Sequence, residues 1–190
     1  MNIEWILIRG SGVAAFALLS AATIWGLLVS SKLLSRIVKA KPLTWFHESL
    51  GIGALLATVV HVVVLSIHDF LEFSWIEILV PGASDWRPLP TALGVMSLYA
   101  LVVVVGSFYL KRFIGQKVWR SIHFMSFGLF ISALAHGMLS GTDTNSPLML
   151  GLYAGSAIVV FALVGQRLTI DRSPVGSTEA SRSPVRTSSD

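Results

Sequence analysis

The sequence predicts an all-α integral membrane protein, a bundle of about five transmembrane helices, and both its composition and the layout of its apolar residues support that fold class. Of its 190 residues, 54% are hydrophobic and only 13% are charged, and the mean hydropathy is +0.74. A soluble domain of ordinary composition is about 25% charged. The apolar residues also gather into five runs, each close to the roughly 20 residues with which a helix crosses a bilayer.

The five runs predict the elements in chain order. Their approximate bounds are 5–30, 43–68, 90–110, 118–140 and 147–166. The third run contains TALGVMSLYALVVVVGSFYL, which has no charged residue and is typical of a membrane span. The first run does not resemble a cleaved signal peptide, because no cationic segment precedes it and its early charges are Glu4 and Arg9.

Two further segments lie outside the runs. The connection 69–89 contains FLEFSWIEILVPG, in which acids alternate with large apolar residues, so it is expected to be either an interfacial amphipathic segment or a plain exterior loop. The end of the chain, DRSPVGSTEASRSPVRTSSD, is polar and cannot bury a core. The sequence therefore predicts a transmembrane bundle over residues 1–168 and a disordered cytoplasmic tail over residues 169–190.

The charged residues between the runs predict the orientation of the chain. The connections after the first and third runs carry cations and no acid: Lys32, Arg36, Lys39, Lys41, Lys111, Arg112, Lys117 and Arg120. The connections after the second and fourth runs carry the acids Asp69, Glu72, Glu77, Asp85 and Asp143. The positive-inside rule then places the N-terminus outside and the C-terminus in the cytoplasm of a multi-pass protein of the cell membrane, whose first partner is membrane lipid. The net charge of +4 is interpreted as a topology signal, and no nucleic-acid partner is expected.

Four histidines lie at matched depths in two of the runs. His47 and His61 are 14 residues apart in the second run, which is about 21 Å along a helix. His123 and His136 are 13 residues apart in the fourth run, which is about 20 Å. Both runs cross the membrane in the same direction, so in neighbouring helices His47 would face His123, and His61 would face His136. Two facing imidazoles at each of two depths suit two bis-histidine haems.

The helical period fits the second run better than the fourth. At about 100° per residue, 14 residues return to within about 40° of the starting direction, whereas 13 residues leave His123 and His136 about 140° apart. The fourth run is therefore expected to be distorted or tilted near Ser126, Gly128 and Ser132.

Other interpretations of the histidines stay open. Single histidines in a helix can hydrogen-bond to a neighbour or reach the membrane interface, and those of a transporter can relay protons. A zinc or copper site would need three or four ligands within a few ångströms, and the chain has no cysteine for a thiolate site. The small residues near the histidines fit the approach of a bulky group as well as ordinary helix packing. They are Gly51, Gly53, Ala57, Gly128 and Gly137.

The residues around these histidines resemble the ferric reductase-like transmembrane domain. The resemblance is carried by the FH that ends at His47, with a histidine fourteen residues later, and by His123, followed thirteen residues later by the HG that begins at His136. WILIRGSG near the start and WRPLPTALG before the third run are similar to bacterial members, and the resemblance covers roughly residues 3–166. The family includes ferric reductases, NADPH oxidases and the haem-binding membrane subunit of the periplasmic methionine sulfoxide reductase system.

The resemblance implies a protein with two b-type haems that transfers electrons from a cytoplasmic or quinol donor to an extracytoplasmic acceptor. Its iron ligands would be His47, His61, His123 and His136. The chain departs from the family pattern in that Glu48 stands where a basic residue is frequent, no sixth helix is evident and no flavin- or nicotinamide-binding domain follows the last run. It is therefore expected to be an oxidoreductase membrane subunit served by a separate flavoprotein or by quinol. A haem-binding sensor or assembly protein without turnover is the alternative.

Two arginines and a fifth histidine complete the predicted site. Arg9 and Arg87 are expected to bind haem propionates, because a guanidinium forms bidentate bonds to carboxylates. Arg9 could instead reach the exterior headgroups or pair with Glu4. His68 lies seven residues after His61, about 10 Å further out. It is expected to be an interfacial residue near the electron exit, because as a ligand in place of His61 it would be out of step with the fourth run.

Overall fold

The computed structural model describes residues 3–31, 40–67 and 73–170. This part of the chain contains helices and turns and no strand, so the all-α fold class expected from the sequence is confirmed. Its helices are α1 (Ile3–Ser30), α2 (Ala40–Ile67), α3 (Trp75–Leu79), α4 (Pro88–Phe124), α5 (Ser126–Ser140) and α6 (Pro147–Ile170). The expected tail lies outside the described residues from residue 171 onward.

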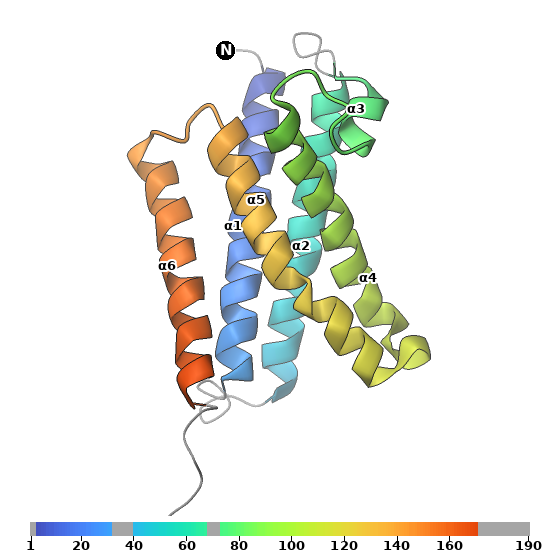
Figure 1. The fold of residues 1–190 in the computed structure, drawn as a ribbon, viewed down its shortest axis with the longest axis vertical. Helices are drawn as coiled ribbons and strands as arrows, with labels where there is room; N and C mark the ends of the chain where they lie inside the picture. Colours follow the sequence, from blue (N-terminus) through green and yellow to red (C-terminus); the bar gives the residue numbers. More distant parts are fainter. Residues whose placement is uncertain (1–2, 32–39, 68–72, 171–190) are drawn as a thin grey trace, which may run out of the picture.

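The longest apolar stretch is long enough to cross a membrane twice. Four stretches of the described residues are long and apolar enough to span, and one of them, Pro88–Ser140, has 53 residues. A straight helix of that length would measure about 80 Å, far more than the roughly 30 Å of the hydrocarbon core. Gly115 divides it, because its φ of 79° and ψ of 162° lie outside the helical region and suit only glycine. The chain reverses there (Figure 1), so this stretch supplies two helical segments and the described residues contain five segments long and apolar enough to span a membrane, as in a multi-pass membrane protein.

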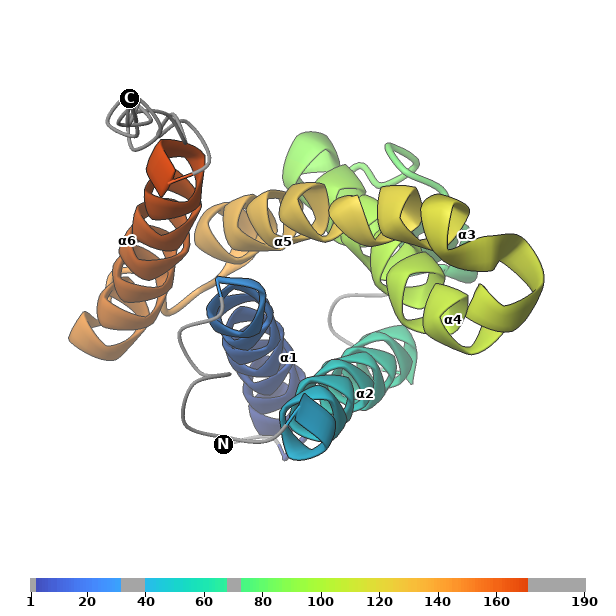
Figure 2. The same ribbon diagram turned by 90° about the horizontal axis from the view of Figure 1, so that it is seen from below.

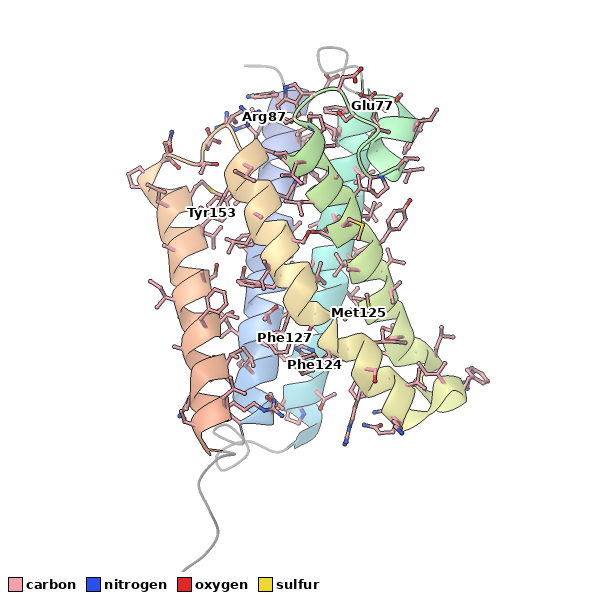
Figure 3. All side chains as sticks on the ribbon, viewed as in Figure 1. Glu77, Arg87, Phe124, Met125, Phe127 and Tyr153 are labelled. Carbon is pink, nitrogen blue, oxygen red and sulfur yellow. The ribbon has the colours of Figure 1, made fainter. Side chains whose placement is uncertain are left out.

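The second crossing of that stretch is broken at Met125, between α4 and α5. The Met125 N–H donates to the carbonyl oxygen of Ile122 at 2.9 Å, three residues back instead of four, which tightens the turn. Figure 3 shows Phe124, Met125 and Phe127 together at this break. The sequence predicts a distortion of this span near Ser126, and the structure places it at the preceding residue.

The long helices pack in two antiparallel pairs. α1 packs along α2, α4 packs along α5, and α6 lies against α1. The end view in Figure 2 shows α1, α2, α4 and α5 around a common centre, with α6 outside them.

One buried cluster joins α1, α5 and α6, in which the Phe16 ring contacts those of Phe130 and Tyr153. A second joins α1, α2, α4 and α5 around the fully buried Ala54. Outward apolar side chains such as Ile158, which is 68% exposed, suit contact with lipid.

The connection between α2 and α4 contains the short helix α3, which has a capping box at its start. The Ser74 hydroxyl accepts the Glu77 N–H at 3.3 Å, and the Glu77 carboxylate accepts the Ser74 N–H at 2.9 Å. Ile78 is buried, whereas Trp75 and Ile76 are exposed. The described part of this connection thus contains one short helix with both a buried and an exposed apolar side chain, and the choice between an interfacial segment and an exterior loop stays a prediction.

Candidate functional site

The structure brings His47 and His123 together at the end of the bundle that contains Gly115. We call them the inner pair, after the side on which the sequence places them. Their ring centroids are 6.0 Å apart and their planes meet at 72°. Two imidazoles that bind one metal ion from opposite sides, at metal–nitrogen distances of about 2.0 Å, have centroids roughly 6 Å apart. The spacing of the inner pair would therefore allow His47 and His123 to hold one metal ion between them.

His61 and His136, the outer pair, line one cavity of about 270 Å³. Its walls come from α1, α2, α4, α5 and α6, and they are mainly apolar, with Phe16, Leu101 and Leu129 among them. Residues of the connection between α2 and α4, such as Ile78, also line it. A mainly apolar cavity with two imidazoles in its lining is typical of a cofactor site.

Three of the four histidines donate a hydrogen bond from Nδ1 to a backbone carbonyl of the neighbouring helix. The bonds join His47 to Ala22 at 3.1 Å, His61 to Ile8 at 2.9 Å and His136 to Pro90 at 2.8 Å. A carbonyl oxygen only accepts, so in each bond Nδ1 carries the proton and a neutral ring has its lone pair on Nε2. None of these Nε2 atoms has a hydrogen-bond partner among the described residues. Histidines that ligate a metal are commonly held in this way.

Three glycines on the neighbouring helices lie against the same rings. A Cβ atom built on Gly12 would lie 3.1 Å from Cε1 of His61, and one on Gly26 would lie 3.0 Å from Cε1 of His47. A Cβ on Gly94 would lie only 2.6 Å from Cε1 of His136. The rings therefore occupy space that any larger residue would fill.

These glycines are not the ones that the sequence singles out. Gly137 faces Tyr153, whose hydroxyl would lie 2.8 Å from an added Cβ, and nothing lies within 4 Å of such an atom at Gly128. Two of the glycines that touch the rings could have been identified from the number of residues between them. Gly12 and Gly26 are 14 residues apart, as are His47 and His61 on the helix that packs against them.

His123 is held differently from the other three histidines. Its ring stacks on that of Trp119, with centroids 5.1 Å apart and planes at 23°. The Nζ atom of Lys111 lies 4.2 Å from the centre of the Trp119 ring. The Trp119 Nε1 atom is buried and has no hydrogen-bond partner among the described residues. An orphaned buried donor of this kind is costly unless an acceptor joins it.

Only one of the two predicted arginines borders the cavity. Arg9 lines it and forms an ion pair with Asp143, which also lines it, in the connection between α5 and α6. Arg87 is not part of the lining; it donates to the carbonyl oxygen of Leu139 and lies over the Trp86 ring, at the end of the bundle where Figure 3 labels it. The partner of Arg9 is thus a carboxylate that the sequence did not suggest.

The remaining predicted residues carry less information. His68 lies outside the described residues. Glu48, the departure from the family pattern, accepts a hydrogen bond from the Tyr109 hydroxyl at 2.8 Å. Among the described residues, no group of three or more histidine, cysteine, aspartate or glutamate side chains is placed to hold a metal ion. The zinc or copper alternative therefore finds no support in this part of the chain.

The chain matches no protein-family model, no curated protein and no solved structure. The resemblance to the ferric reductase-like domain therefore stays a prediction, and the function has to be argued from the geometry of the two histidine pairs.

Proposed function

We propose that the chain binds two b-type haems and passes electrons across the membrane, with the inner pair holding one haem and the outer pair the other. The observation that carries the proposal is the 6.0 Å between the ring centroids of His47 and His123, a spacing at which both imidazoles could hold one iron. A bound b-type haem supplies a reversible one-electron change at its iron.

The residues of this chain have distinct parts in that function. The carbonyl bonds of His47, His61 and His136 keep Nε2 unprotonated, which is the form that binds a metal. The apolar walls of the cavity exclude water around the outer pair, and a low dielectric strengthens the influence of nearby charges on a redox centre. Arg9 places a cation at the cavity, where it can bind a propionate in exchange for Asp143.

The two pairs lie at separate depths. They are about 21 Å apart along α2, so together they cover much of the roughly 30 Å hydrocarbon core. The four cations beside Gly115 support an entry for electrons at the inner end, because they would attract an acidic donor protein. These cations are Lys111, Arg112, Lys117 and Arg120. A membrane quinol is the other candidate donor, and the acceptor is expected on the opposite side.

Purified full-length protein tests the proposal by haem analysis and by reduced-minus-oxidised spectra. We expect two low-spin haems per chain. His136→Ala should remove or convert the outer haem and leave the inner one low-spin, and His123→Ala should do the reverse, because the pairs lie about 20 Å apart. Folded protein without a reducible haem would exclude electron transfer and favour the proton-relay transporter. Haem that stays oxidised in membranes supplied with NAD(P)H or quinol would favour the sensor.

A further inference from the structure

The same three-part arrangement occurs three times in the bundle. A histidine Nδ1 donates to the carbonyl oxygen of a residue in the neighbouring helix, and the residue four positions later in that helix is a glycine that touches the ring. The three sets are Ile8 and Gly12 with His61, Ala22 and Gly26 with His47, and Pro90 and Gly94 with His136. The spacing of four is the same in each set although two different helices, α1 and α4, supply the carbonyls.

The hydrogen bonds within the same helices explain why the fourth residue matters. In a helix, the side chain of a residue lies beside the carbonyl oxygen four positions earlier. On α1, the Ser11 hydroxyl donates to the Leu7 carbonyl at 2.6 Å. On α4, the Ser97 hydroxyl donates to the Leu93 carbonyl at 2.7 Å. A serine at the fourth position does not exclude a small donor from the next helix, because the Leu93 carbonyl also accepts the Ser132 hydroxyl of α5 at 2.9 Å. An imidazole ring is bulkier, and at the three histidines it lies 2.6–3.1 Å from where a Cβ would stand. Glycine at that position therefore gives the ring the room to reach the oxygen.

We propose that Gly12, Gly26 and Gly94 are positioning residues that set the tautomer and the orientation of three histidines. Each glycine gives the ring room to reach a backbone carbonyl with Nδ1. The consequence is that Nε2 carries the lone pair in His61, His47 and His136, respectively. The significance of this for iron rests on the proposed function, whereas the tautomers themselves can be measured independently of any haem.

The arrangement is incomplete at His123, which stacks on Trp119. Both histidines of the outer pair are therefore fixed through backbone carbonyls, but only one histidine of the inner pair is. Substitution of Gly12 or Gly94 is expected to affect the outer centre, and substitution of Gly26 the inner centre.

The test compares Gly12→Ala, Gly26→Ala and Gly94→Ala with two controls on the same helices. Nothing lies within 4 Å of a Cβ added at Gly10 on α1 or at Gly106 on α4. Alanine is a better helix former than glycine, so Gly10→Ala and Gly106→Ala should fold at least as well as the wild type. Any effect seen only in the three variants is then due to the ring contact and not to the loss of a glycine.

The first measurement is nitrogen-15 NMR of the histidine rings in the full chain, in which the two neutral tautomers differ in chemical shift. We expect the Nδ1–H tautomer for three of the four paired histidines in the wild type and its loss for one ring in each variant. The second is titration with haem, followed by low-temperature spectra of each centre. Partners that orient metal ligands typically contribute 10–100-fold to affinity, so each variant should bind haem at one centre roughly 10–100-fold more weakly.

The outcomes separate this inference from the proposed function. A wild-type spectrum with Nε2–H tautomers would overturn the inference, even if no glycine variant can be purified. So would haem affinities and spectra that are the same in the three variants and in the two controls. Protein that binds no haem but shows the three Nδ1–H tautomers would refute the proposed function and leave the positioning role of the glycines standing.

Discussion

At the scale of single residues, the four paired histidines differ in how firmly they are held. Three are held by a directional hydrogen bond to a backbone carbonyl, whereas His123 depends on its stacking with Trp119. Aromatic stacking contributes about 0.5–1.5 kcal/mol, and it does not select a tautomer. We therefore expect the ring of His123 to be the most easily displaced of the four.

This difference predicts the effect of Trp119→Leu. We expect the variant to weaken haem binding at the inner centre roughly tenfold and to leave the outer centre as in the wild type, since a group that orients a ligand acts on that ligand's metal alone. Trp119→Phe should restore much of the loss because it keeps a ring against His123. Haem titration and low-temperature spectra measure both effects. Trp45→Leu, at a side chain that is 68% exposed, is the control; equal losses at both centres of Trp119→Leu would contradict the prediction.

Arg9 and Asp143 provide a second prediction at this scale. Each side chain is 38% exposed, and exposed ion pairs contribute about 0–1 kcal/mol. Asp143→Asn should therefore lower the free energy of unfolding by no more than about 1 kcal/mol and leave the haem content unchanged. Arg9→Gln should cost a similar amount of stability and also lower the occupancy of the outer centre, because it removes the cation from the cavity. Chemical denaturation and haem analysis of the two variants measure this, and equal haem content in both would exclude a role of Arg9 in binding a propionate.

At the scale of elements, α3 depends on its capping box. The hydrogen bonds from the Ser74 N–H and the Ser74 hydroxyl hold the pKa of the Glu77 carboxyl below its ordinary value. A carboxyl whose pKa is lowered by folding stabilises the fold at pH above its ordinary value of about 4.3, and this contribution is lost as the pH falls through the lowered value. The helix should thus be insensitive to pH near neutrality and fray in acid.

The corresponding variant is Ser74→Ala, which removes the N-cap. Loss of such a cap costs about 1 kcal/mol of local helix stability, so hydrogen exchange of the α3 amides should become several-fold faster at neutral pH. The exchange of α1 and α2 should not change, because α3 lies outside these spans. If the variant also loses the acid-induced fraying expected in the wild type, the two effects share one cause. Fraying of α3 in acid that is undiminished in Ser74→Ala would show that the capping box is not its origin.

The elements also show how far the sequence could be interpreted. The five apolar segments could be predicted from the lengths of the apolar runs. The pairing of His47 with His123 could be predicted from the number of residues between the histidines. The break at Met125 could be predicted only in part, because the 13-residue spacing of His123 and His136 requires a distortion but does not say where it lies. The role of Gly94 could not be predicted, since it depends on how α4 is rotated toward α5. A single sequence gives that rotation only where two helices repeat the same spacing.

At the scale of the whole molecule, five spans place the start of α1 and the end of α6 at opposite ends of the bundle (Figure 1). The end that contains Gly115 carries a group of cations, and the opposite end carries Glu77 and Asp143. The positive-inside rule then predicts that the Gly115 end faces the cytoplasm.

The absence of cysteine makes this orientation easy to measure. Single cysteines can be introduced as Asn145→Cys, between α5 and α6, and as Gln116→Cys, beside Gly115; both positions are exposed. We expect a membrane-impermeant maleimide to label the first in intact cells and the second only after the membrane is opened. Labelling of Gln116→Cys in intact cells would reverse the orientation and with it the proposed direction of electron flow. The unmodified chain is the blank.

The matched spacing of glycines on α1 and histidines on α2 has a mechanical consequence. Fourteen residues are two heptads, and helices that keep contact at that repeat wind around one another with a left hand. Two identical docking points on one pair of helices also fix their register, because a slide of one turn, about 5.4 Å, would break both hydrogen bonds at once. One residue inserted between His47 and His61 would rotate one ring by about 100° relative to the other. The two contacts between α1 and α2 thus keep the sites of His47 and His61 at a constant separation when other helices of the bundle move.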